Sequence, residues 1–245
     1  MRHPLARAFG GAGLNAVDVA ARLGVDPKTV ARWLAGRTPY PRHQAMLANL
    51  TGWSVDQLWP DASRRAETDQ ASADLGAVYP HRSAIGLDLW RHVFARADHE
   101  IGVLVYSGLF LAEDVAVQRI WRDKARRGVR IRFVLGDPAS THVQQRGADE
   151  GIADVMAVRI RNALALLQPL VGEPGVDLRL HDTVLYNSIY LTDDDLIVNT
   201  HVYGRPASHA PVLHLRRGQD DGMTATYLDS FERVWSTARP VPLVD

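Results

Sequence analysis

Residues 18–41, with the sequence DVAARLGVDPKTVARWLAGRTPYP, predict two short helices joined by a tight turn. Gly24 lies between them and, because it has no side chain, it can adopt the left-handed backbone that ends a helix. Asn15 can cap the first of these helices. Asp26 is a good N-cap for the second helix, and Pro27 suits its first position, where the missing N–H would be unpaired anyway. We expect Val30 to face a core that the two helices share. This segment therefore predicts a small helical domain.

The segment resembles the helix-turn-helix of Cro and lambda-repressor type regulators, the XRE family, over about residues 4–59. The residues that carry the resemblance are Ala20, Gly24, Val25, Thr29, Val30, Arg32, Trp33 and Gly36. Pro27 departs from the pattern, because many relatives have a glutamine there that contacts a base or a phosphate. Since proline cannot donate a hydrogen bond, one contact would be lost.

The resemblance implies a role for each polar residue near the second helix. Lys28 and Arg32 would read base edges in the major groove, where both residue types pair best with guanine. Thr29 and the loop residues Arg37 and Thr38 would hold phosphates, which fixes register without reading sequence. Double-stranded DNA is the expected partner, and a homodimer would bind an operator that is an inverted repeat. The alternative is a helical hairpin that never contacts DNA.

The chain is too long, at 245 residues, for this module alone, so we expect two domains. Residues 1–60 form the helical domain, with helices predicted over 4–12, 16–23, 27–35 and 42–50 and a short fifth one near residue 59. Residues 61–75 are polar, lack an apolar period and predict a linker to a second domain over 76–245. Residues 1–61 carry a formal charge of +3 against −3 elsewhere, a difference too small to decide function.

Composition excludes several classes of protein. The sequence has no cysteine, which rules out disulfides, thiolate zinc sites and cysteine nucleophiles. No apolar run reaches the length of about 20 residues that spans a membrane, and the first residues do not resemble a signal peptide. We therefore expect a cytoplasmic protein without membrane contact.

The second domain alternates helices and strands. Helices are predicted over 83–97, 113–127, 152–170 and 223–238, and strands over 101–106, 129–135, 176–180, 184–191, 196–200 and 212–216. Strands separated by helices predict an α/β domain with a mixed or parallel sheet flanked by helices.

Two stretches of this domain, 101–138 and 178–204, resemble the phospholipase D-like fold. In that superfamily a histidine attacks phosphorus, and a lysine two residues later holds the phosphate oxygens. His181 stands at the histidine position, but Thr183 replaces the lysine and Ser188 replaces an aspartate. Asn199 and Thr200 lie where a glycine–serine pair is usual, and one motif copy means that a complete site would need two chains. The resemblance therefore implies a non-catalytic descendant, because the phosphate-binding cation is missing.

Polar and aromatic residues on neighbouring predicted strands could still bind a small effector, such as a phosphate-bearing or nucleotide-like molecule. The candidates are Tyr106, Ser107, His181, Asn187, Tyr190, Asn199, His201 and Tyr203. The alternative for each residue is ordinary packing in the core or at its rim. His201 and His209 have no close third partner, so no metal site and no cofactor are expected.

The whole pattern predicts a homodimeric transcriptional regulator, whose second domain senses a small ligand. One alternative is a phosphodiesterase or nuclease that uses His181 and is directed to DNA by the first domain. Another is an antitoxin-like regulator, whose second domain binds a partner protein.

Overall fold

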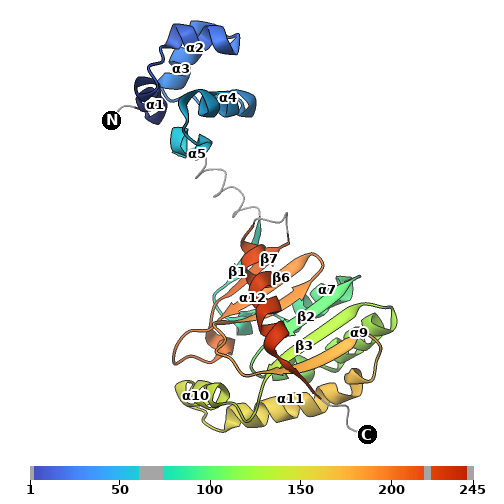
Figure 1. The fold of residues 1–245 in the computed structure, drawn as a ribbon. Coiled ribbons are helices and arrows are strands. Elements are labelled where there is room, and N and C mark those ends of the chain that lie inside the picture. The colour runs from blue at the N-terminus through green and yellow to red at the C-terminus, as the bar shows by residue number, and fades with distance from the viewer. Residues whose placement is uncertain (1–2, 61–73, 218–221, 242–245) are drawn as a thin grey trace. The chain divides into compact units, whose positions relative to one another are not determined.

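The computed structural model describes residues 3–60, 74–217 and 222–241, and the chain divides into two compact units, 1–70 and 71–245 (Figure 1). Most of the predicted linker, residues 61–73, lies outside the described residues. The linker prediction was wrong at its end, because Leu75 begins the first strand of the second unit. Among the described residues, no helix is long and apolar enough to cross a membrane.

The described part of the first unit contains only helices. These are α1 (Pro4–Gly11), α2 (Ala16–Leu23), α3 (Pro27–Leu34), α4 (Pro41–Thr51) and α5 (Val55–Leu58). One residue from each helix is fully buried in a shared core, namely Leu5, Val19, Val30, Leu47 and Leu58. Burial of each such side chain contributes about 1.5–3 kcal/mol, which offsets the weak intrinsic stability of helices this short.

The second unit is built on a mixed sheet, as the sequence predicts. Its strands are β1 (Leu75–Tyr79), β2 (Glu100–Leu104), β3 (Arg130–Gly136), β4 (Val176–His181), β5 (Asn187–Thr192), β6 (Asp195–Thr200), β7 (Val212–Arg216) and β8 (Arg239–Pro240). Their order across the sheet is β1-β7-β6-β5-β2-β3-β4-β8 within the described residues. The strands β2, β3 and β4 pair in parallel, and the remaining pairs are antiparallel. In β2 and β3 every residue after the first is buried, as expected for strands that are covered on both faces, whereas β4 alternates between buried and more exposed residues over its first four positions.

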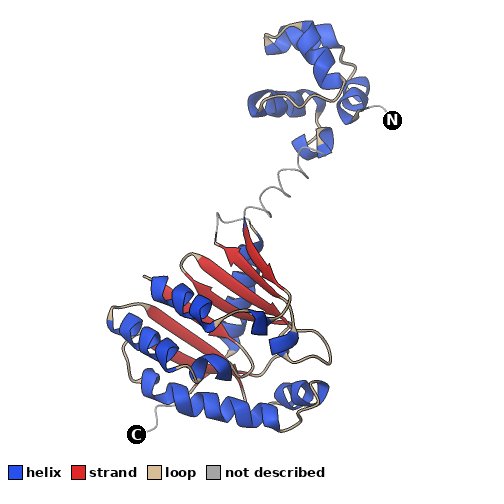
Figure 2. Cartoon of the chain, turned by 180° about the vertical axis from the view of Figure 1, so that it is seen from behind, coloured by secondary structure: helices blue, strands red, loops and turns tan. Residues whose placement is uncertain are grey.

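Helices cover the sheet on both sides. They are α7 (Leu87–Arg96), α8 (Leu109–Ala112), α9 (Val115–Arg126), α10 (Thr141–Asp149), α11 (Val155–Val171) and α12 (Met223–Thr237), with 3-10 turns η1 (Arg82–Ala84) and η2 (Ala207–His209). Figure 1 has α12 in front of the sheet, and Figure 2, from behind, brings the opposite layer forward. Under α7 and α9, the rings of Trp90, Phe94, Trp121 and Phe133 pack in a continuous series of aromatic contacts.

Several element predictions need correction. The helix predicted over 83–97 is the turn η1 followed by α7, because Gly86 is extended and caps a new helix. The strand predicted over 184–191 begins at Asn187, and Tyr186 before it is 81% exposed in a loop. The elements β1, α8, α10 and β8 were not predicted. Each is short or lacks a clear apolar period, so pattern alone does not separate it from a loop.

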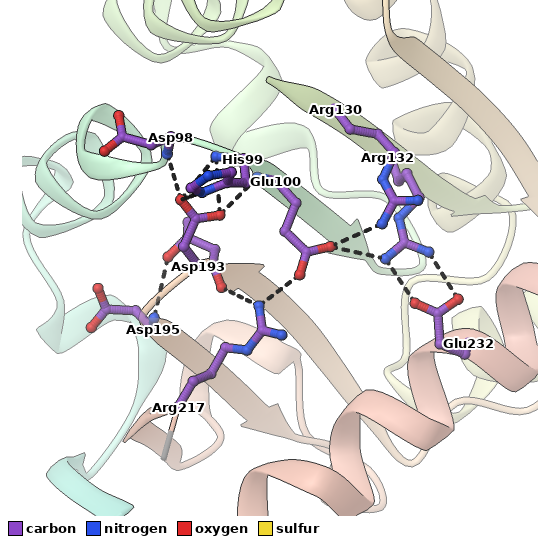
Figure 3. Close-up of polar contacts among 10 residues, drawn as sticks. Asp98, His99, Glu100, Arg130, Arg132, Asp193, Asp195, Arg217 and Glu232 are labelled. Atoms are coloured by element: carbon purple, nitrogen blue, oxygen red, sulfur yellow. Dashed lines mark hydrogen bonds and ion pairs between the residues drawn. The ribbon is translucent and has the colours of Figure 1, made fainter. Parts of the chain in front are cut away.

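A network of ion pairs at the amino ends of β2 and β3 ties α12 to the sheet (Figure 3). Glu100 accepts hydrogen bonds from Arg217 at 2.7 Å and from Arg132 at 3.3 Å, and Arg132 also contacts Glu232 of α12 at 2.7 Å. Burial opposes ionisation of Glu100, but the hydrogen bond and charge of Arg217, with help from Arg132, outweigh it and lower the pKa of the carboxyl. The network is therefore structural.

Candidate functional site

The outer face of α3 is open to solvent. Lys28 and Arg32 are exposed on this face and Thr29 is half-buried, whereas Val30 and Trp33 are buried on the opposite face. The ring of Trp33 lies 5.3 Å from that of His43 in α4. The helix is thus fixed by its apolar side, and Lys28 and Arg32 on its polar side are exposed.

Capping groups set the start of α2 and of α3, as the sequence indicates. The Asn15 side chain accepts from the N–H groups of Val17 and Asp18, and the Asp26 side chain accepts from the N–H of Lys28 at 2.7 Å. Gly24 ends α2 at a φ of +64°, which a residue with a side chain adopts only with strain. These contacts determine the direction in which α3 leaves the turn.

A hollow of about 460 Å³ lies beside the outer face of α3. Its lining residues are Thr29, Arg32, Trp33, Arg37, Thr38, Pro39, Tyr40, Pro41, Arg42 and His43. Three of these are arginines and none is acidic, so the surface attracts anions. Arg37 and Thr38 are exposed here, as a phosphate contact requires. Sequence reasoning missed Arg42 and Tyr40, although an aromatic residue between two prolines is a signal for an exposed loop.

The second unit has a pocket of about 330 Å³ beyond the carboxyl end of β2. Its lining residues are Arg82, Val105, Tyr106, Ser107, Gly108, Leu109, Phe110, Glu113, Arg146, Glu150, Met156, Arg159, Ser188, Tyr190, His201, Pro206, Ala207 and Ser208. They come from strands, helices and both 3-10 turns, so the pocket depends on the assembled fold.

Half of the predicted ligand residues line this pocket. They are Tyr106, Ser107, Tyr190 and His201. The structure does not bring the other four to its wall. Asn187 pairs with Thr200 at the start of β5, and Tyr203 is 84% exposed in the loop after β6. Asn199 is fully buried and donates to the carbonyls of Ala210 and Pro211.

His181 lies behind the pocket, beside Tyr106, with a ring centroid distance of 5.6 Å. It is 1% exposed, and its Nε2 lies 3.2 Å from the carbonyl oxygen of Val105. Because a carbonyl only accepts, Nε2 carries the proton and has no lone pair to attack phosphorus. Burial lowers the pKa of His181, which keeps the ring neutral. In this arrangement His181 is a core histidine.

Ser188 and His201 form a hydrogen-bonded pair on the pocket wall. Nδ1 of His201 lies 3.0 Å from the carbonyl oxygen of Leu185, so Nδ1 holds the proton and donates. Nε2 is then free to accept from the Ser188 hydroxyl at 3.0 Å. Burial, together with the charge of Arg146, lowers the pKa of His201 to about 4. The pair is neutral at physiological pH, and its hydrogen bonds are satisfied internally.

Sequence reasoning missed the three arginines of the pocket. Arg82 lies in η1, Arg146 in α10 and Arg159 in α11. Arg146 could not be placed near the site because α10 was not predicted. Arg159 has the pattern of an ordinary solvent-exposed charge on a helix, so nothing in the sequence marks it as a site residue. No spacing rule connects three residues on separate elements. Among the described residues, no group of three histidine or acidic side chains is suited to hold a metal ion.

Comparisons with known proteins give resemblances of fold only. No protein-family model and no curated protein matches the sequence. Nuc, a phospholipase D family member from Salmonella typhimurium, matches 67% of this chain over 97% of its own, with 14% identity and a TM-score of 0.41. The archaeal chromatin protein TrmBL2, described as having a novel mode of DNA binding, matches 89% of this chain over 72% of its own, with 13% identity and a TM-score of 0.43.

A third structure is the phosphatidylserine synthase of Haemophilus influenzae, with 11% identity and a TM-score of 0.46 over 84% of this chain. The match spans only 48% of that enzyme. At these identities and TM-scores, the resemblances assign neither a family nor an activity to this chain, whose function must be argued from its own residues.

Proposed function

We propose that this protein is a sequence-specific DNA-binding transcriptional regulator, in which α2 and α3 act as a helix-turn-helix. The observation that carries the proposal is the two-sided character of α3. Val30 and Trp33 bury one side, while Lys28 and Arg32 lie free on the other. A helix held by its apolar face, with basic side chains outward, suits the major groove of duplex DNA.

The hollow beside α3 supports the same proposal. Arg37 and Thr38 are exposed along it and supply donors for phosphate oxygens next to the groove that α3 would occupy. Phosphate contacts provide affinity and register, whereas Lys28 and Arg32 provide the choice of base. We propose further that the protein acts as a homodimer, whose two copies of α3 bind half-sites one helical turn apart, about 10 base pairs.

In this proposal the second unit senses a small effector through its pocket rather than performing hydrolysis. A nucleophilic histidine needs a free nitrogen that faces the substrate. His181 lies outside the pocket lining and is 1% exposed, so neither of its ring nitrogens reaches a substrate in the pocket. The residue at the expected lysine position is Thr183, which supplies no cation. These features argue against the phosphodiesterase alternative.

The test is selection of bound duplexes from random DNA, followed by footprinting with the full chain. We expect one enriched inverted repeat and protection of both half-sites. Lys28→Ala and Arg32→Ala should lose the preference, whereas Arg22→Ala, an exposed arginine on α2, should keep it. Failure to enrich any sequence, with a protein that stays monomeric on DNA, would overturn the proposal.

A further inference from the structure

The pocket of the second unit is rich in hydrogen-bond donors. Arg82, Arg146 and Arg159 reach its wall from three elements far apart in the sequence. The two acidic residues of the wall are Glu113, which is exposed, and Glu150, which forms an ion pair with Arg146. The wall therefore carries three arginines against two glutamates, which leaves an excess of positive charge.

Arg146 is held rigidly, with one nitrogen left over. Its side chain is 10% exposed, Nε and Nη2 contact Glu150 at 2.6 Å, and Nη2 also donates to the carbonyl of Arg205. Nη1 has no hydrogen-bond partner within the described residues, although this side chain lines the pocket. A buried, fixed guanidinium with a spare donor is a preorganised binding group, because little side-chain entropy is lost when it binds.

Two further donors have no carboxylate partner among the residues that the structure describes, namely the guanidinium groups of Arg82 and Arg159. The Arg82 guanidinium lies 3.7 Å from the centre of the Phe110 ring, a contact that orients the group but leaves its charge in place. Tyr106 accepts from the N–H of Leu185 at 3.1 Å, so its own hydroxyl proton is free to donate.

We infer that this pocket binds a small organic molecule through an oxyanion, a carboxylate or a phosphate, whose oxygens accept hydrogen bonds from Arg82, Arg146 and Arg159. Both groups are acceptor-only and match the planar fork of arginine. The volume of about 330 Å³ is at the lower end for ligand pockets, which restricts the ligand to small metabolites. The inference rests on the proposed sensing role of the second unit and specifies its chemistry.

The test is titration calorimetry of the full chain without DNA, at constant ionic strength. The probes are benzoate and succinate for carboxylates, and glycerol 3-phosphate and AMP for phosphates, with glycerol and adenosine as neutral counterparts. We expect saturable binding of at least one anion and none of the neutral compounds. Binding of the carboxylates or of the phosphates then identifies which oxyanion the pocket accepts. No binding by any of the four anions would overturn the inference.

Variants at exposed or half-exposed positions keep the test independent of folding. Arg82→Gln and Arg159→Gln should each weaken binding of the active probe at least tenfold. Arg161→Gln is the matched control, because Arg161 is exposed on the same helix as Arg159 but does not line the pocket. Equal binding by all three variants would contradict the inference. DNA binding of the wild-type chain is measured separately. A chain that binds DNA but none of the anions would contradict only the anion site, and a chain that binds an anion but selects no DNA sequence would contradict only the proposed regulator function.

Discussion

The outer face of α3 and the pocket of the second unit differ in how the chain builds them. The α3 face comes from one stretch of about a dozen residues, and its capping groups and glycine turn lie within the same stretch. The pocket gathers its arginines from η1, α10 and α11, across more than 70 positions of sequence. A local site can be identified from spacing, whereas an assembled site requires the fold. Four experiments test this contrast, beginning with the largest expected effect.

The first experiment removes the support of the pocket. Trp90 is 1% exposed, and its ring contacts those of Phe110 and Tyr190, both of which line the pocket. Trp90→Ala should lower the free energy of unfolding of the second unit by about 3–5 kcal/mol through the cavity it creates. Denaturant unfolding followed by circular dichroism measures the loss. A change below 1 kcal/mol would mean that the pocket does not depend on this packing.

The second experiment uses pH. Burial lowers the pKa of His201 to about 4, below its unfolded value near 6.5, so the unfolded chain binds more protons between these values. Above pH 6.5 His201 is neutral in both the folded and the unfolded chain and does not change the free energy of unfolding. As the pH drops from 6.5 toward 4, this residue lowers the free energy of unfolding by about 2–3 kcal/mol. His181, whose pKa burial also lowers, adds to the same slope.

Unfolding measured at several pH values gives the slope. His201→Gln should reduce the pH dependence between 6.5 and 4. An identical slope in wild type and His201→Gln would show that His201 titrates normally.

The third experiment addresses the α3 face. Arg32→Ala should cost about 1–3 kcal/mol on the selected DNA site and relax the base preference at one position, because a base contact is lost. Fluorescence anisotropy with the selected site and with single-base variants measures both effects. Equal weakening on all sequences would make Arg32 a phosphate contact instead.

The fourth and smallest effect concerns Arg37. Arg37→Ala should weaken binding to all duplexes by a similar factor and reduce the slope of log affinity against log salt by about 1, because one phosphate contact is lost. Titrations at several salt concentrations check this, with Arg22→Ala as the control. A change of base preference would show that Arg37 contacts a base rather than a phosphate.

Prediction from sequence succeeded where causes are local. The bounds of α2, the capping roles of Asn15 and Asp26 and the left-handed Gly24 follow from residues next to each other in the chain. The mixed sheet was also predicted, because buried strands have distinctive apolar runs.

Only half of the residues predicted for the ligand site line the pocket. Tyr106 ends one predicted strand and His201 directly follows another, and strand ends place side chains beside one another. Asn199 was chosen by the same logic, yet it points into the sheet and satisfies backbone carbonyls. Which face a polar residue takes depends on register and on neighbours from distant segments, and the pattern of a single strand does not contain that information.

The position of Arg82 has a mechanical consequence. Its backbone N–H donates to the carbonyl of Ala210, and it follows β1 by three residues. Every covalent path from this unit to the first sixty residues runs through β1. A ligand that draws on the Arg82 side chain would therefore act three residues from β1, the strand at the end of the sheet order that pairs with β7.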